Sequence, residues 1–410
     1  MKPTDPHAGT PASAWIWPLA ATLAIQTSSS FLGRIVPTVA PVVTAEAGMS
    51  EATIGYMSAL STCGSVLFLM AGHPLIRRFG PIRALQAGLL LSCFGLAMLA
   101  TPHWAFVLLS NLVLGLGYGP SAPAGSDILL RHAPPAHRTL IFSLKQAGVP
   151  AGGVMAGLLL PWLIDRMDWK TALLAVAFLP LLRVLAVQPV QRRVDAGADP
   201  NQPIGWRVLS SPTNLFAPLR MAMASPVLRA LSLAAACFAV AQGTIIAFSV
   251  TYVVQRLGYD LVAGGVVFAV MQVTGIFGRI GLGWLADRLG SNIAVLSLNA
   301  LAMAATQAAW AFTGPSWSFA GLVTLAAVAG VTITSWNGVQ LAEVARLAPQ
   351  GRVSEGTAGA TLVTFMGYIV GPAAFASLLS LTDSYSVCFG VVGVLGLVAF
   401  AAIRTAASRT

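Results

Sequence analysis

Residues 385–404 read YSVCFGVVGVLGLVAFAAIR, a run of 20 residues whose single charge, Arg404, stands at its last position. A helix needs about 20 predominantly apolar residues to cross the hydrocarbon core of a bilayer, so this stretch predicts a spanning helix. The strands of a transmembrane barrel would alternate with a period of two residues, which this run does not do. The stretch therefore predicts an α-helical membrane protein.

Runs of the same kind recur along the whole chain, about every 30 residues. The chain has 410 residues, of which 56% are hydrophobic and 9% charged, whereas a soluble chain carries about 25% charged residues. Twelve runs are long enough to span a membrane. They cover residues 15–44, 50–76, 82–101, 104–130, 139–164, 170–189, 227–255, 261–286, 291–313, 316–344, 354–381 and 385–404. We therefore predict an all-α polytopic membrane protein with twelve transmembrane helices.

One polar stretch, from Pro189 to Pro226, interrupts this pattern and leaves six runs on each side. A linker between two compact six-helix bundles would have such a composition. The predicted parts are an N-terminal tail 1–14, a bundle 15–189, a linker 190–226, a second bundle 227–404 and a tail 405–410. The N-terminal tail has no cleavage-site pattern, so we expect the first run to remain as a span.

The net charge of +10 follows the predicted topology rather than a nucleic-acid surface. Sixteen of the 23 Lys and Arg residues lie in the tails or in the loops on the linker side of the spans. The positive-inside rule then places both termini and the linker in the cytoplasm, with the chain in the cytoplasmic membrane. The four Cys residues all fall within spans and the five His residues form no metal spacing, so we expect no cofactor and no metal.

Two pairs of loops indicate that the halves are related. Arg77-Arg78-Phe79-Gly80 corresponds to Asp287-Arg288-Leu289-Gly290, and Arg131-His132-Ala133-Pro134 corresponds to Arg346-Leu347-Ala348-Pro349. Two related six-helix halves place a substrate site at their interface near the midplane, with access alternating as the halves rock.

The stretch Gly283-Trp284-Leu285-Ala286-Asp287-Arg288-Leu289-Gly290 resembles the loop signature Gly-x-x-x-Asp-Arg-x-Gly of the major facilitator superfamily. The first-half copy departs from it, with His73 at the glycine position and Arg77 at the aspartate. The helix 4 signature usually opens with an arginine, and Asn111 holds that place. The resemblance covers essentially the whole chain and implies a secondary transporter of twelve helices, not an enzyme.

Four basic residues, Arg34, Lys145, Arg183 and Arg279, lie inside apolar runs, and no acidic residue lies near the middle of any run. A charge in hydrocarbon costs roughly 2.5–3.5 kcal/mol on insertion scales, so unpaired intramembrane cations favour an anionic substrate. Arg279 resembles in position the helix 8 arginine that binds the substrate carboxylate in monocarboxylate and oxalate transporters. A planar guanidinium suits that bidentate contact. The alternative is an arginine that closes a helix contact onto carbonyls.

The other embedded cations leave more alternatives open. Lys145, followed by Gln146, is a candidate substrate and coupling residue, because a desolvated lysine can lose its proton. It could instead snorkel to the interface. Arg34 faces either the cavity or a neighbouring helix, and we expect Arg183 to snorkel.

Polar and aromatic residues of the expected cavity helices complete the predicted site, although a packing or interfacial role is the commoner one for each such residue. The predicted substrate-binding residues are Arg279, Lys145, Arg34, Tyr118, Gln146, Asn337, Trp336, Tyr368 and Gln242. A second set near the cytoplasmic ends is expected to latch the conformational cycle. It contains Asp127, Arg78, Asp287, Arg288, Glu343 and Arg346.

These features predict a monomeric transporter that moves a small organic anion, most simply a monocarboxylate, by proton symport through the bilayer. The alternatives are an anion exchanger and a proton-driven exporter of drugs or metabolites. Such exporters generally need a titratable acid in the cavity, and none is found there. A membrane enzyme would need a nucleophile–base or metal constellation, which the sequence does not contain.

Overall fold

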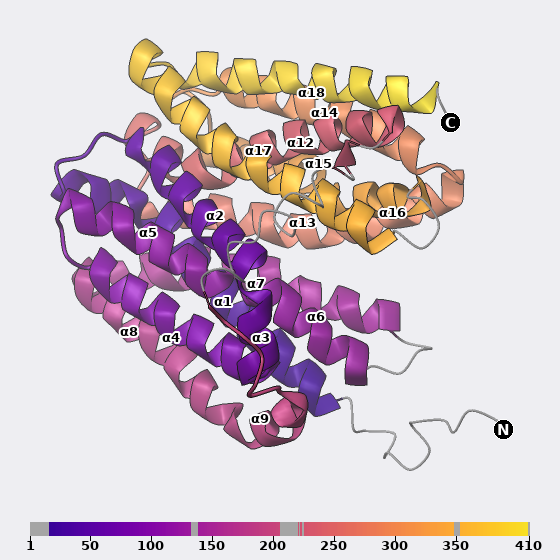
Figure 1. The fold of residues 1–410 in the computed structure, drawn as a ribbon. Helices are drawn as coiled ribbons and strands as arrows, with labels where there is room; N and C mark the ends of the chain where they lie inside the picture. The colour runs from indigo at the N-terminus through magenta and orange to yellow at the C-terminus, as the bar shows by residue number, and fades with distance from the viewer. Residues whose placement is uncertain are drawn as a thin grey trace.

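The computed structural model describes residues 16–132, 138–205, 220, 222–223, 225–347 and 353–408. The described residues build an all-helical protein (Figure 1), which confirms the predicted fold class. The predicted tail 1–14 and much of the second half of the predicted linker lie outside the described residues.

Helices follow one another along the N-terminal half, up to the short turn η2 (Asp195–Gly197). They are α1 (Ile16–Glu46), α2 (Thr53–Ala71), α3 (His73–Phe79), α4 (Pro81–Leu99), α5 (Trp104–Tyr118), α6 (Ser121–His132), α7 (Arg138–Ile164), α8 (Trp169–Ala186) and α9 (Gln188–Val194). The C-terminal half contains α12 (Pro226–Thr251), the π-helical turn η3 (Tyr252–Arg256), α13 (Leu261–Leu289), α14 (Asn292–Ala311), α15 (Phe319–Ile333), α16 (Asn337–Leu347), α17 (Val353–Thr382) and α18 (Tyr385–Ala407).

Eleven helical segments of the described chain are long and apolar enough to cross a membrane. They agree with eleven of the twelve predicted spans. The first predicted span corresponds to α1, whose 31 residues are also long enough but less apolar. The polar run Gln26–Ser30 and Arg34 lower its hydropathy, and these polar residues bear on the site described below.

Two predicted spans are each divided into two helices well inside their bounds, and the run 50–76 also breaks, near its end, at Gly72 between α2 and α3. The run 104–130 breaks between α5 and α6, where Pro120 and Pro123 lack the N–H that would continue the ladder. The run 316–344 breaks between α15 and α16 without a proline. There the hydroxyls of Thr334 and Ser335 both donate to the carbonyl of Gly330, at 2.8 Å each. Such side-chain bonds to a preceding turn compete with the helical ladder.

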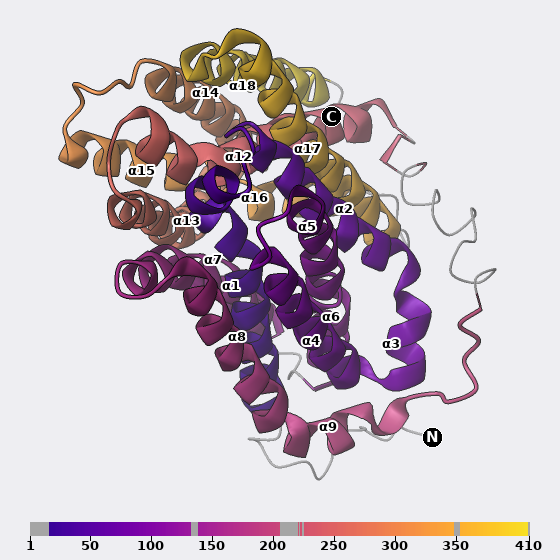
Figure 2. The same cartoon turned by 90° about the vertical axis from the view of Figure 1, so that its left-hand side faces the viewer.

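The two halves lie side by side, with α1–α8 below and α12–α18 above in Figure 1, and Figure 2 shows the same division from the side. We call the end that carries α3, α9 and the C-terminal ends of α6 and α16 the linker end. The opposite end, with the turns at residues 47–52 and 257–260, is the far end. The predicted domain boundaries remain predictions.

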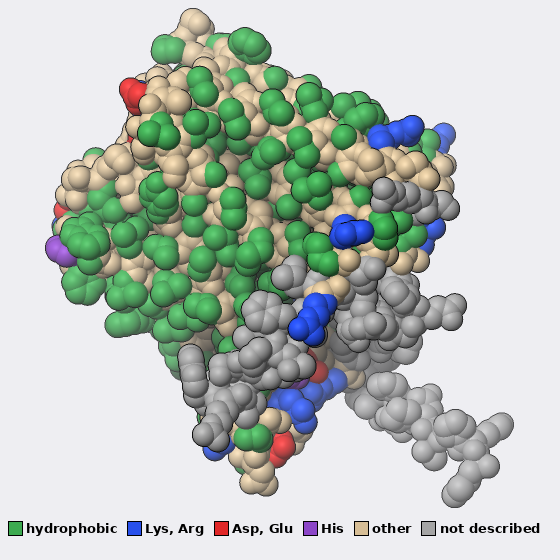
Figure 3. Space-filling view, turned by 45° about the horizontal axis from the view of Figure 1, so that its top comes forward, with side chains coloured by type: hydrophobic (Ala, Val, Ile, Leu, Met, Phe, Trp, Pro, Cys, Tyr) green, Lys and Arg blue, Asp and Glu red, His purple; other side chains and the backbone are tan. Residues whose placement is uncertain are grey.

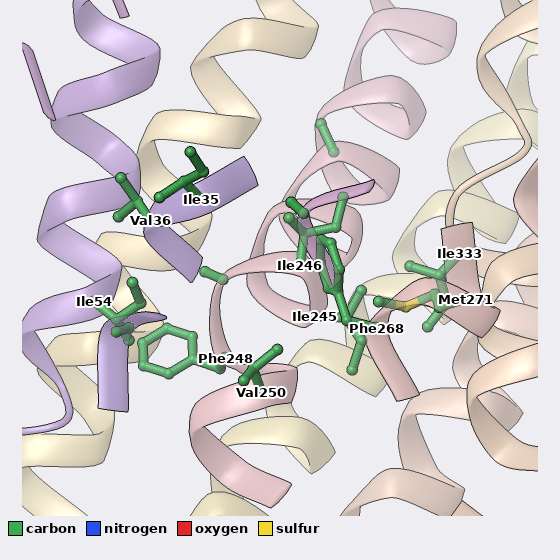
Figure 4. Close-up of a cluster of buried hydrophobic side chains, with 14 of the residues drawn as sticks. Ile35, Val36, Ile54, Ile245, Ile246, Phe248, Val250, Phe268, Met271 and Ile333 are labelled. Carbon is green, nitrogen blue, oxygen red and sulfur yellow. The ribbon is translucent and has the colours of Figure 1, made fainter. Parts of the chain in front are cut away.

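Close packing joins the halves through α7 and α13 and through α2 and α17. A Cβ atom at Gly157 of α7 would lie 2.7 Å from the carbonyl oxygen of Gly265 on α13, so the backbones touch there. Both glycines lie in the far-end parts of their helices. Figure 4 shows the buried apolar cluster that includes Ile54 of α2 and Phe248 of α12.

Apolar and basic side chains occupy different parts of the surface. In Figure 3 hydrophobic side chains cover the face on the left, and Lys and Arg side chains gather on the right, toward the linker end. An apolar band of this kind suits lipid contact. The predicted cytoplasmic orientation of the linker end agrees with this distribution and remains a prediction.

Candidate substrate site

Arg34 of α1 and Arg279 of α13 come from opposite halves, and their charges are close enough to interact. Both side chains are partly exposed. The hydroxyl groups of Tyr118 in α5 and Tyr368 in α17 lie within interaction range of both guanidinium groups. The structure therefore brings four of the predicted site residues together, two from each half, and we call Arg34, Tyr118, Arg279 and Tyr368 the central group.

Arg279 is positioned by the close approach of α13 to the break between α15 and α16. A Cβ atom at Gly278 would lie 2.4 Å from the hydroxyl oxygen of Ser335, so only glycine lets the two segments meet. The Nε and one Nη of Arg279 each donate to the carbonyl oxygen of Thr334, at 3.3 Å. This contact was the alternative to substrate binding. Because two donors share one acceptor and the side chain is partly exposed, the guanidinium keeps donors for an anion.

Lys145 of α7 is buried, with 2% of the residue's surface exposed. Its Nζ donates to the carbonyl oxygen of Ser121, at 3.1 Å, where α6 begins. A Cβ atom at Gly125 would lie 2.8 Å from Cε of Lys145, so the lysine rests directly on the glycine. The side chain therefore points into the protein, and the snorkelling alternative is wrong for this conformation.

Lys145 and Arg279 occupy similar places in the two halves. Each cation reaches from a neighbouring helix to a carbonyl oxygen at the break of a divided span. Carbonyl dipoles at a break stabilise a cation without neutralising its charge. An anion that approaches therefore still meets a positive site.

The other predicted residues of the C-terminal half form one hydrogen-bonded group. The Oε1 of Gln242 on α12 accepts from Nε1 of Trp336, at 3.0 Å, and from the hydroxyl of Tyr368, at 2.8 Å. Asn337 donates to the Tyr368 oxygen at 3.4 Å. Trp336 is fully buried and stacks on Phe238, with ring centroids 5.1 Å apart. In this conformation Trp336 packs the core, which was the alternative reading of this residue.

The N-terminal half contributes a smaller group. Nε2 of Gln26 donates to the hydroxyl oxygens of Ser30 and Tyr118, both at 3.4 Å. Gln146 is exposed. Asn111, at the place of the family arginine, is buried and donates to the carbonyl of Val107 at 2.8 Å, so it serves its own helix.

Arg183 differs from its prediction. Its guanidinium donates to the carbonyl oxygen of Ala24 on α1, at 2.9 Å, instead of reaching the interface. It therefore joins α8 to α1 and lies outside the central group.

The predicted latch residues contact their own halves or the linker. Asp127 pairs with Arg131 at 2.7 Å on α6, and Arg78 donates to the carbonyl of Gln202 at 3.1 Å. In the C-terminal half, buried Glu343 pairs with Arg346 at 2.6 Å and accepts from Asn292 of α14 at 3.0 Å. Arg288 lies over the ring of Trp284. Asp287 lies beside them at the end of α13. A latch between the halves remains a prediction for another conformation.

Sequence reasoning missed an ionic cluster at the far end. Arg256 of the C-terminal half pairs both with Glu51 of the N-terminal half and with Asp383. The hydroxyl of Tyr385 also donates to Glu51, at 3.3 Å. We call Glu51, Arg256 and Asp383 the far-end clamp. Arg256 stood out in the sequence only as one of few cations on that side of the predicted membrane.

Comparison with known proteins identifies the family to which this chain belongs. Residues 19–343 match the Major Facilitator Superfamily, and the chain belongs to this family of secondary transporters. It is therefore a multi-pass membrane transporter and not an enzyme.

The relatives include proteins named for organic acids. The chain is 26% identical over 333 residues to monocarboxylate transporter 13 of Bos taurus, covering 78% of this chain and 72% of that protein. It is 23% identical over 368 residues to the 4-hydroxybenzoate transporter PcaK of Pseudomonas putida, covering 84% and 81%. Among solved structures, a bacterial homologue of the lysosomal transporter Spinster, described as inward-facing and occupied, has a TM-score of 0.75 at 16% identity, covering 97% and 98%.

Proposed function

We propose that the protein transports a small organic anion, most simply a monocarboxylate, which binds between Arg34 and Arg279. The observation that supports this proposal is the pair of interacting guanidinium groups from opposite halves. None of the ion pairs found among the described residues includes either arginine. Two like charges repel in a low-dielectric site, and an anion between them turns repulsion into two attractions.

This geometry also suggests how binding drives transport. Arg34 belongs to one half and Arg279 to the other, while the close contacts and the clamp described above join the halves at the far end. An anion held by both arginines would draw the halves together around the site, which is the occlusion step of alternating access. We place the linker end in the cytoplasm, in accordance with the predicted charge asymmetry, and we propose proton symport, with anion exchange as the alternative.

Binding to purified protein tests the anion site. We would titrate acetate, propionate, oxalate and benzoate by isothermal calorimetry against wild type, Arg279→Lys and Arg34→Lys. A lysine cannot reproduce the planar fork of donors, so we expect each variant to bind carboxylate at least tenfold more weakly, which equals ~1.4 kcal/mol. Arg183→Lys is the matched control, because Arg183 lies outside the central group. Unchanged affinity in both Arg279→Lys and Arg34→Lys would overturn the proposal.

Liposome uptake then separates the coupling modes. Symport predicts accumulation of the bound carboxylate under an inward proton gradient with no anion inside. Exchange predicts uptake only when the liposomes are preloaded with a carboxylate, whatever the pH difference.

A further inference from the structure

The hydrogen bonds around Tyr368 have a direction that the donor inventory determines. The indole Nε1 of Trp336 can only donate, so the atom of Gln242 that lies 3.0 Å away must be its carbonyl oxygen. A carbonyl oxygen can only accept. The Tyr368 hydroxyl, 2.8 Å from the same oxygen, must therefore donate its single proton to Gln242.

Asn337 must present its NH₂ group to Tyr368, because the phenol has no second proton to give. The distance of 3.4 Å from Nδ2 to the phenol oxygen agrees with this direction. Tyr368 is partly exposed and its oxygen lies within interaction range of Arg34 and Arg279. Tyr368 thus has no proton left to donate toward Arg34 and Arg279, and it offers the one lone pair that Asn337 does not use.

Tyr118, in the other half, is not constrained in this way. Its oxygen accepts from Nε2 of Gln26 at 3.4 Å, and no described group takes the Tyr118 proton. The Tyr118 hydroxyl is therefore able to donate to an anion or to accept from a donor. Tyr368 alone of the two tyrosines has a fixed polarity.

We propose that Tyr368 acts as a hydrogen-bond acceptor toward the substrate, and that it selects organic anions that carry a hydroxyl group besides the carboxylate. The inference rests on the proposed anion site and names the substrate class more narrowly. A carboxylate oxygen cannot bond to the Tyr368 lone pairs, because both atoms are acceptors, so the carboxylate must bind at the arginines. A hydroxyl group elsewhere on the substrate can donate to Tyr368. A site that accepts from a substrate hydroxyl discriminates against analogues that lack it.

Matched ligands test the selection. The aromatic set is benzoate with the 2-, 3- and 4-hydroxybenzoates and the corresponding methoxybenzoates, and the aliphatic set is propionate, lactate and 2-methoxypropionate. Within a set the carboxylate is constant and only the donor changes. We expect at least one hydroxy acid to bind wild type roughly tenfold more tightly than both its deoxy and its methoxy partner, the effect of about one hydrogen bond.

Two variants distinguish selection of the substrate hydroxyl by Tyr368 from a role of Tyr368 in positioning the arginines. Tyr368→Phe should abolish the preference, so that the hydroxy, deoxy and methoxy acids of a set bind this variant with similar affinities. Gln242→Leu removes the acceptor that holds the phenol proton, so the hydroxyl can donate, and the preference should shift toward the methoxy acid. Tyr259→Phe and Gln307→Leu are matched controls, because Tyr259 bonds the carbonyl of Trp317 and Gln307 that of Ala241. Both controls should keep the preference of wild type.

The inference is overturned if wild type shows no preference for any hydroxy acid. It is also overturned if Tyr368→Phe weakens all members of a set equally, because Tyr368 would then act by supporting the arginines. Either result leaves the anion site intact as long as carboxylate binding depends on Arg279. If no member of either set binds, the anion site and the selection both fail.

Discussion

Lys145 lies in surroundings very different from those of a lysine in water. It is buried, its ammonium group has one recorded hydrogen bond, to the Ser121 carbonyl, and the hydroxyl of Ser121 has no partner. A lysine held in this way is a candidate proton carrier, since an ammonium group loses its proton more readily when desolvated. The coupling role of Lys145 remains a prediction.

Substitutions at Lys145 test that role. Lys145→Gln should abolish accumulation driven by a proton gradient yet keep downhill exchange, because the variant cannot take up the coupled proton. Lys145→Arg should bind the anion and release it slowly, because an arginine does not deprotonate in proteins. Proteoliposome uptake with and without a gradient measures both. Normal gradient-driven accumulation in the two variants would assign Lys145 a structural role.

Gly125→Ala provides an independent variant, because it leaves Lys145 in place chemically. The new Cβ would lie 2.8 Å from Cε and 3.0 Å from Nζ of Lys145, so the end of the lysine side chain must shift from its position beside the Ser121 carbonyl. We expect gradient-driven uptake to fall severalfold. If uptake in Gly125→Ala matched wild type, the position of the ammonium group would not matter for coupling.

At the scale of elements, α4 begins without a capping side chain of its own, because Gly80 precedes it. The linker supplies the cap. One carboxylate oxygen of buried Asp195 accepts from the backbone N–H of Ile82 at 2.8 Å, and the other accepts from that of Arg83 at 3.0 Å. Gln191 adds a third hydrogen bond at 3.1 Å. The start of the linker is thereby fixed to the N-terminal half.

Asp195→Ala should destabilise the protein by about 1–2 kcal/mol, because it leaves two backbone donors of the helix terminus without a partner. The apparent melting temperature in detergent should fall by a few degrees, and carboxylate affinity should not change. Asp199→Ala is the control, since the exposed Asp199 side chain accepts from the backbone N–H of Asn201 in a surface turn. Equal melting temperatures for Asp195→Ala and the control would contradict the capping role.

At the scale of the whole molecule, the halves touch at the far end through the glycine contact of α7 with α13 and through the clamp. Tyr56 of α2 also meets Ser377 of α17, with their hydroxyl oxygens 3.0 Å apart. Transport requires these contacts to open when the linker end closes. The clamp should therefore set part of the balance between the two conformations.

Arg256→Gln should shift that balance toward a far-end-open state. Exposed ion pairs are worth ~0.2–1 kcal/mol each, so we expect a severalfold rise in the open population. Spin-label distances between Ala45 and Ser386, on either side of the clamp, would report it. Lys170→Gln is the control, because Lys170 pairs with Glu46 within one half, at 2.6 Å. A distance distribution in Arg256→Gln that equals that of wild type would show that the clamp does not hold the far end closed.

The sequence by itself determined where the membrane helices run. The predicted run 385–404 is α18 (Tyr385–Ala407), and 354–381 is α17 (Val353–Thr382), because the hydropathy of a span is a local property of its own residues. The sequence also indicated which charged residues are candidates for a function, since placing a cation within the membrane costs free energy whatever its partners are. Arg34 and Arg279 were found in this way.

Only the tertiary structure decided which groups meet. The break at Thr334 contains no proline that could have predicted it. The sequence left Lys145 equally compatible with snorkelling, and its contact with the start of α6 decides against that in this conformation. The clamp joins Glu51 to Arg256 and Asp383, which lie far apart in the chain. The polarity of Tyr368 depends on Gln242 and Trp336, from two other helices. Such pairings depend on how the helices pack across the two halves, and periodicity within one helix carries no information about its neighbours.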